Sequence, residues 1–286
     1  MSEFLIEDKI RSFLAEDIGF EDVTTESVVD EKTQAVAIIT CNERAVLAGL
    51  KEASKVFEIL GCKVKLLKDD GALVEAGTRI MEIDGYGKNI LKGERVALNL
   101  LMRMTGIATA TYRIISKAKK VNPKVRIACT RKTVPGLRYF DKKAVMLGGG
   151  DTHRLRLDDC VLIKDNHIKL VGSVKECVKR VRKNVSFTKK IEVEVENLNQ
   201  AIEAAEAEAD IIMLDNMKPN EISLILEELR KRGMRDKILV ECSGRINEEN
   251  IEDYVRTGVD IISIGALTHS VKSVDMSLEI KEIKKT

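Results

Sequence analysis

The sequence has no tryptophan, and aromatic residues make up only 3% of its 286 positions. Proteins that bind single-stranded nucleic acids stack bases on aromatic side chains, so this composition disfavours such a role. The net charge is only +2, because 48 lysines and arginines nearly balance 46 aspartates and glutamates. General nucleic-acid binding, which usually depends on a strong basic excess, is therefore not expected.

Long apolar runs and cysteine motifs are also missing. No run approaches the roughly 18 apolar residues of a membrane span, and the first ten residues are charged from the third onward, with no apolar signal region. The six cysteines form no C-x-x-C pair, so neither a zinc site nor a redox motif is indicated. We expect a cytoplasmic protein with reduced thiols and no membrane partner.

The composition nevertheless provides for a full core. Hydrophobic residues make up 44% of the chain, and its length suffices for one large domain and a smaller companion. The first hundred residues contain two helical segments, 6–16 and 91–116, around short strand-like pieces at 35–41, 44–48 and 63–67. This part predicts a β sandwich with helices.

From residue 124 onward, apolar strand-like runs alternate with amphipathic helical runs, which is typical of βαβ units and a parallel sheet. The expected strands are 125–130, 160–164, 191–196, 210–215, 238–243 and 260–265, and the expected helices are 174–182, 198–207, 221–231 and 248–257. Such a pattern fits a doubly wound sheet or a barrel. Almost every strand ends on polar or glycine residues, which favours a barrel, since barrels gather functional groups at many strand ends. No G-x-G-x-x-G follows a strand, so a dinucleotide site is not indicated.

The densest functional pattern is basic and follows the first of these strands. Arg131 and Lys132 precede a Pro135–Gly136 turn, which aims them into the strand-end mouth. Three glycines at 148–150 then allow close backbone approach to a ligand. The basic residues Arg131, Lys132, His153, Arg154, Lys164 and His167 converge between Thr130 and His167, and such a mouth would suit carboxylates or phosphates.

Carboxylates lie on later strands. The period of two in Ile191–Glu196 places Glu192, Glu194 and Glu196 on one strand face, where burial is costly unless they are paired or ligand-bound. Together with Asp215 they could hold ribose hydroxyls or a hydrated Mg²⁺. For Glu192, an ordinary buried ion pair is an equal alternative.

Two small-residue turns follow the last two strands. They read Ser243-Gly244-Arg245 and Ile264-Gly265-Ala266. Such turns commonly bind a phosphate on backbone N–H groups in α/β barrels. As a consecutive pair, they predict a phosphate site.

With these residues in view, the chain resembles the quinolinate phosphoribosyltransferases over nearly its whole length. The resemblance rests on the strings TRKTxPGLR, GGGxxHR, LIKDNH, ExEVEN, LDN and GALTHS, together with the segments 16–25, 93–101 and 105–109. It implies an α/β sandwich domain over 1–108, joined by a C-terminal helix at 270–286, and an incomplete α/β barrel of parallel strands over 109–269.

The resemblance also implies an activity. A pentosyltransferase would join quinolinate to phosphoribosyl pyrophosphate with Mg²⁺, giving nicotinate mononucleotide, pyrophosphate and CO₂ for NAD biosynthesis. A homodimer, or a hexamer built as a trimer of dimers, would be the active unit, with Arg95 reaching into the neighbouring subunit's site. No direct protein ligand to the metal is implied, since Mg²⁺ would arrive on phosphoribosyl pyrophosphate.

Site residues follow from the same resemblance. The implied catalytic residues are Lys132, His153, Lys164, Glu194 and Asp215. The implied substrate-binding residues are Arg95, Thr130, Arg131, Lys132, Arg154, Lys164, Glu194, Asp215, Ser243, Gly244, Arg245, Ile264, Gly265 and Ala266. Lys132 and His153 stay open as alternatives for the proton donor after decarboxylation.

Two positions depart from the family pattern. Thr152 stands where asparagine is usual, and Arg245 replaces the last glycine of a Ser-Gly-Gly turn. The added cation is compatible with phosphate binding, but its side chain could crowd the turn. Rival assignments are nicotinate phosphoribosyltransferase, the ModD protein associated with molybdenum transport, and a non-catalytic polyanion-binding module. The intact LIKDNH string favours the quinolinate enzyme over ModD.

Overall fold

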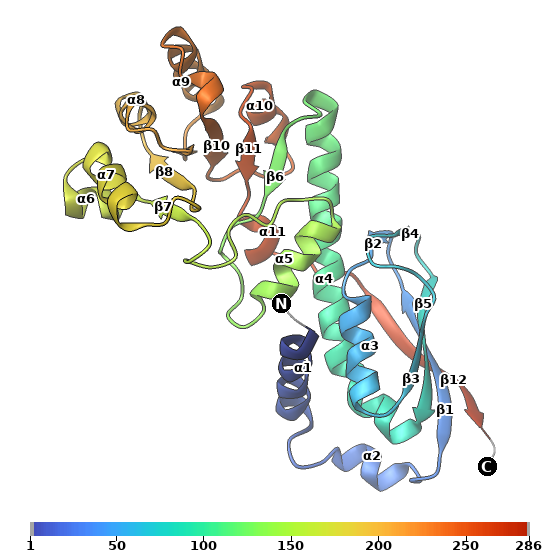
Figure 1. The fold of residues 1–286 in the computed structure, drawn as a ribbon. Coiled ribbons are helices and arrows are strands. Elements are labelled where there is room, and N and C mark those ends of the chain that lie inside the picture. The colour runs from blue at the N-terminus through green and yellow to red at the C-terminus, as the bar shows by residue number, and fades with distance from the viewer. Residues whose placement is uncertain (1–2, 285–286) are drawn as a thin grey trace. The chain divides into compact units, whose positions relative to one another are not determined.

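The computed structural model describes residues 3–284, which divide into two compact units (Figure 1). Among these residues, the first unit comprises 3–110, 139–149 and 271–284, and the second comprises Thr111–Arg138 and Gly150–Ser270. The division falls within the long helix α4 (Gly87–Val121). None of the described helices is long and apolar enough to cross a membrane.

The first unit is built on an antiparallel sheet in the order β12-β1-β5-β3. Its strands are β1 (Gln34–Cys41), β3 (Lys63–Leu66), β5 (Thr78–Tyr86) and β12 (Met276–Lys284), and a separate pair joins β2 (Ala45–Val46) to β4 (Leu73–Val74). The helices of this unit are α1 (Glu3–Ile18), α2 (Val23–Val28), α3 (Leu50–Ile59) and most of α5 (Arg138–Leu147), besides the first part of α4. In Figure 1, α3 and the beginning of α4 lie along one face of the sheet. The expected α/β sandwich is therefore observed.

The C-terminal segment is a strand, so the expectation of a helix at 270–286 was wrong. Residues Met276, Leu278 and Ile280 alternate with polar residues, and a period of two is typical of strands. β12 pairs antiparallel with β1 along its whole length, from Met276 opposite Cys41 to Lys284 opposite Gln34. The open edge of β1 thus provides a ladder of backbone hydrogen bonds that an isolated helix could not replace.

The second unit contains six parallel strands in the order β6-β11-β10-β9-β8-β7. They are β6 (Arg126–Ala128), β7 (Val161–Ile163), β8 (Ile191–Val195), β9 (Ile211–Asp215), β10 (Leu239–Ser243) and β11 (Ile261–Ser263). One further parallel bridge joins Ala128 to Asp151. Since β11 pairs with β6 and β7 forms the opposite edge, the strands follow one another around an incomplete barrel, as expected.

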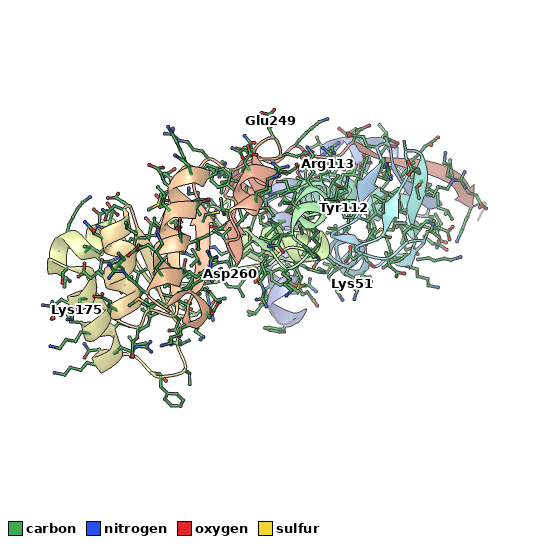
Figure 2. All side chains as sticks on the ribbon, turned by 90° about the horizontal axis from the view of Figure 1, so that it is seen from above. Lys51, Tyr112, Arg113, Lys175, Glu249 and Asp260 are labelled. Atoms are coloured by element: carbon green, nitrogen blue, oxygen red, sulfur yellow. The ribbon has the colours of Figure 1, made fainter. Side chains whose placement is uncertain are left out.

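Helices connect these strands and lie on their outer side (Figure 1). They are α6 (Asp165–Val171), α7 (Val174–Asn184), α8 (Leu198–Glu206), α9 (Pro219–Lys231) and α10 (Ile251–Arg256), with the 3₁₀ turn η1 (Arg235–Lys237) before β10. Figure 2 shows their charged side chains on the outside, as with the exposed Lys175 of α7. The short helix α11 (Ala266–His269) follows the last parallel strand, β11, and two of its residues line the cavity described below.

The two faces of the parallel strands differ in chemistry. The side chains of one face are aliphatic or thiol-bearing and fully buried: Val193, Val195, Ile212, Leu214, Val240, Cys242 and Ile262. Burial of one such aliphatic side chain contributes about 2 kcal/mol. Because side chains alternate along a strand, the residues between them, such as Glu194, Met213 and Glu241, must point to the other face. Because the apolar side chains pack on the helix-facing side of the strands, the alternate side chains must point into the barrel interior.

Candidate active site

A cavity of about 910 Å³ opens at the carboxyl ends of the parallel strands. Its volume suits a ligand of small-molecule size or a pair of such ligands. The predicted site residues that line it are Thr130, Arg131, Lys132, His153, Arg154, Lys164, Glu194, Asp215, Ser243, Gly244, Arg245, Ile264, Gly265 and Ala266. The structure therefore brings these residues together around one cavity. Arg95 belongs to the other unit, on α4, and does not line this cavity.

Strand register explains how residues far apart in sequence meet. Glu194 and Glu241 are both paired in register with Met213 of the intervening β9, so these three side chains form one row. Asp215, Ser243 and Ser263 form the next row toward the carboxyl ends. The first row lines the cavity deeper than the second, which forms its rim.

Several cations crowd one side of the cavity. The Nε atom of Arg131 is buried and has no hydrogen-bond partner among the residues the structure describes. Burial lowers the pKa of this guanidinium, and the nearby charges of Arg154 and Arg138 lower it further. An arginine stays charged over the physiological range, so mutual repulsion and a donor without an acceptor both favour binding of an anion here.

Two hydrogen bonds to its backbone groups hold Lys132 at the rim of the cavity. The carbonyl oxygen of Lys132 accepts a hydrogen bond from the Thr268 hydroxyl at 2.9 Å, and its N–H donates to the Thr130 hydroxyl at 3.1 Å. A Cβ added to Gly265 would lie 3.0 Å from Cδ of Lys132. The small residue at 265 therefore leaves room for the lysine side chain beside the last strand-end turn.

Carboxylates lie among and beneath these cations. Glu194 pairs with Lys164, and Asp215 accepts a hydrogen bond from the Asn216 side chain at 2.6 Å. Glu192, the alternative ion-pair candidate, is fully buried and lies 3.3 Å from Nε2 of His153. Since the oxygens of Glu194 and Asp215 border the cavity, they could meet hydroxyl groups or a metal-bound phosphate.

The turn after β10 is shaped for close approach of a ligand. Gly244 has a φ of 103°, and a Cβ there would lie 2.3 Å from Oδ1 of Asn216. Arg245 follows with a φ of 52°, in the left-handed region that non-glycine residues rarely adopt. His153 and Asn216, which also line the cavity, have φ values of 49° and 54°. Backbone strain of this kind is concentrated at functional sites.

Some cavity residues were not predicted. They are Leu162, Met213, Asn216, Glu241, Ile246, Asn247, Ser263 and His269. Glu241 is the most important, because its carboxyl group is fully buried. A carboxylate inside the largely apolar run Leu239–Ser243 was the available signal, but it lacks the alternation that identified Glu192.

Comparison with known proteins places this geometry in a family. The model "Quinolinate phosphoribosyl transferase, N-terminal domain" matches residues 22–105, and "Quinolinate phosphoribosyl transferase, C-terminal domain" matches residues 107–279. The chain belongs to the quinolinate phosphoribosyltransferase family. The match of two domain models in succession covers both units.

Relatives agree over nearly their whole length. A protein of Methanocaldococcus jannaschii, named a probable nicotinate-nucleotide pyrophosphorylase (carboxylating), is 54% identical over 273 residues, which are 95% of this chain and 95% of the relative. A protein of Methanothermobacter thermautotrophicus with the same name is 50% identical over 97% of this chain and 99% of its own. The solved nicotinate-nucleotide pyrophosphorylase of Francisella tularensis has a TM-score of 0.91 at 35% identity, covering 98% of each chain.

The left-handed backbone at Arg245 leads to a prediction about stability. This conformation costs a residue with a Cβ about 1 kcal/mol or more. The free energy of unfolding of the Arg245→Gly variant is therefore expected to be higher than that of the wild type by up to about 1 kcal/mol. Part of the gain is lost because glycine makes the unfolded chain more flexible. Urea denaturation measures the change.

Glu208 is a matched control, because it has a φ of 60° but lies outside the cavity. Glu208→Gly should give a similar gain. Loss of stability in Arg245→Gly alone would contradict the account, since it would show that the arginine side chain stabilises the turn by more than the strain costs.

Proposed function

We propose that the chain transfers the phosphoribosyl group of phosphoribosyl pyrophosphate to quinolinate with decarboxylation, giving nicotinate mononucleotide, pyrophosphate and CO₂, a step of NAD biosynthesis. The observation that carries this proposal is the buried Nε of Arg131, which has no hydrogen-bond partner in the described part of the chain and lies near the charges of Arg154 and Arg138. Quinolinate carries two adjacent carboxylates, and a planar guanidinium binds a carboxylate through two parallel hydrogen bonds. The relatives' names, which include "carboxylating", support the same activity.

The second substrate fits the opposite side of the cavity. The 5-phosphate would bind at the turns 243–245 and 264–266, where glycine backbone and the Arg245 cation are available. The ribose hydroxyls would then meet Glu194 and Asp215. Mg²⁺ would arrive on the pyrophosphate and neutralise its charge, and the carboxylate oxygens of Glu194 and Asp215 are of the type that Mg²⁺ prefers.

With the substrates placed in this way, the reaction has two stages: transfer of the ribose to the quinolinate ring nitrogen, and then loss of a carboxylate from that ring. The ring nitrogen of quinolinate attacks the anomeric carbon while the bond to pyrophosphate breaks, and positive charge develops on the ribose. The carboxylates of Glu194 and Asp215 are placed to stabilise that charge. The adjacent carboxylate then leaves as CO₂, and its bonding electrons stay on the ring carbon beside the cationic nitrogen until a proton arrives.

Lys132 is the better candidate for delivering that proton. It lines the cavity, and its backbone is fixed from both sides. His153, the other candidate, has both ring nitrogens engaged within the protein: Nδ1 accepts a hydrogen bond from the N–H of Arg154, and Nε2 faces two carboxylates. No nitrogen of His153 remains to face a substrate.

We further propose a cytoplasmic homodimer, either alone or within a hexamer, in which Arg95 completes the partner's site. The six cysteines are all free, which suits a reducing compartment. Arg95 is the predicted substrate-binding residue that the cavity of its own chain does not use, and a symmetric dimer would supply two copies of it reciprocally.

Purified protein with Mg²⁺, phosphoribosyl pyrophosphate and quinolinate should release CO₂ and form nicotinate mononucleotide in equal amounts. Radiolabelled carboxylate and chromatography of the nucleotide measure both products. Nicotinate in place of quinolinate is the control. Turnover with nicotinate but not with quinolinate would assign the chain to the rival activity, and turnover with neither would favour a non-catalytic polyanion-binding module.

A mixing experiment tests the shared site. Arg95→Ala and Lys164→Ala should each be inactive, because each removes a cation from every site. After subunit exchange, random pairing makes half of the dimers mixed, with one intact site each, so about a quarter of wild-type activity should return. Exchange verified by mass-tagged subunits without return of activity would exclude a site that takes Arg95 from its partner.

A further inference from the structure

A cluster of buried ionisable groups lies beneath the cavity and is not accounted for by the reaction above. It consists of Glu192 on β8, Glu241 on β10 and His153 in the loop after Asp151. Both carboxylates are fully buried, and Nε2 of His153 lies 3.3 Å from one oxygen of each. None of the four carboxylate oxygens has a hydrogen bond of ordinary geometry among the residues the structure describes, so the ion-pair contacts with His153 are their closest polar contacts there. The histidine is therefore the group that holds the two acids in place.

The hydrogen bonds of the ring define its tautomer. Nδ1 accepts from the backbone N–H of Arg154 at 2.7 Å, so it carries a lone pair. The proton of the neutral ring must then be on Nε2, facing the two carboxylates. The N–H of His153 itself donates to Oδ1 of Asp151 at 2.8 Å. These contacts fix the strained backbone of His153 and lead directly to Arg154.

Protons within this cluster are shared rather than assigned to single groups. Burial disfavours a charged His153, but hydrogen bonds and charge from Glu192 and Glu241 outweigh it, so the pKa of the ring, coupled to its carboxylate partners, is raised. Burial likewise raises the pKa of Glu192. The cluster therefore holds an extra proton at neutral pH, and the lone pair on Nδ1 places that proton on the carboxylate side.

A metal ion is the alternative occupant. The three ligand atoms lie within 4.8 Å of one another, and imidazole nitrogens and carboxylate oxygens are both zinc ligands in proteins. A metal-bound histidine, however, donates its other ring N–H to an acceptor. Here Nδ1 faces a donor, and Nε2 needs its proton, so no lone pair is left for the metal. The contacts favour a shared proton.

Arg154 connects this cluster to the cavity. Its backbone N–H is bound to the His153 ring, its side chain donates to the carbonyl oxygen of Cys160 at 3.1 Å, and it lines the cavity. The Arg154 charge also acts on Glu192. The buried acids thus fix the loop before Arg154 and supply negative charge beneath crowded cations.

We propose that Glu192 and Glu241, acting through His153, are positioning residues that hold Arg154 for the quinolinate dicarboxylate. This inference rests on the proposed function. It predicts an effect on one substrate, because the phosphoribosyl partner is placed at other turns.

Glu192→Gln and Glu241→Gln test the proposal separately, since each keeps the shape of the side chain and removes its charge. Each should raise the KM and the Kd for quinolinate at least tenfold, while the KM for phosphoribosyl pyrophosphate changes less than twofold. Calorimetry and steady-state kinetics on the full chain measure these values. Glu227→Gln, which removes an exposed carboxylate of α9, is the matched control and should change neither.

Ring ¹⁵N spectroscopy gives a second, independent readout, and the chain has only three histidines to assign. In the wild type, His153 should show a protonated Nε2 and an unprotonated Nδ1. A fully protonated ring would contradict the tautomer. One equivalent of bound zinc, retained through purification and lost in Glu241→Gln, would show a metal site instead.

The outcomes separate this inference from the proposed function. If the wild type turns over quinolinate but the folded variants bind it as tightly as the wild type, the positioning role is wrong. Equal losses for both substrates would also contradict it, since they would indicate general damage to the barrel. If the wild type neither binds nor converts quinolinate, the proposed function itself fails.

Discussion

The contact between His153 and two fully buried carboxylates is the constraint on which the arrangement of the cavity depends. Nε2 lies 3.3 Å from an oxygen of Glu192 and from an oxygen of Glu241. Buried acids without a partner would be very costly, so the histidine and the shared proton allow two carboxylates to occupy a barrel interior that aliphatic residues usually fill. Their negative charge lies beneath the arginines, whose mutual repulsion would otherwise oppose folding in the absence of a ligand.

The register of the parallel strands determines which side chains lie next to this contact and which lie at the rim of the cavity. Met213 joins Glu194 and Glu241 in one row, and Asp215, Ser243 and Ser263 form the next. Polar groups from four strands that are far apart in sequence therefore meet around one cavity. Backbone strain at the rim, as in the left-handed Arg245, is tolerated because the strands and helices around it are well packed.

Much of this could be predicted from the sequence. Strands of the second unit and the basic residues after them follow from the alternation of apolar runs with polar strand ends, and Glu192 and Glu194 follow from the period of two. Glu241 could not be placed in the same way, because a single carboxylate in the run Leu239–Ser243 shows no alternation. Only pairing across β9 reveals that it lies level with Glu194.

For the C-terminal segment, the prediction of a helix was wrong because its pairing partner is distant in sequence. Its local pattern does favour a strand, but its partner β1 is more than 200 residues earlier in the chain, and no local signal identifies such a pairing. The proposed role of Arg95 has a similar limit, since a residue that would complete a neighbouring subunit's site leaves no trace in the periodicity of its own helix.

The central claim is that the cations around Arg131 bind a small dicarboxylate. Calorimetric titration of quinolinate into the wild type and into Arg131→Ala tests it most directly, with thermal unfolding to confirm that the variant is folded. Loss of a charge-assisted, bidentate contact of about 3 kcal/mol should weaken binding roughly a hundredfold. A folded Arg131→Ala protein that binds quinolinate with wild-type affinity would contradict the account.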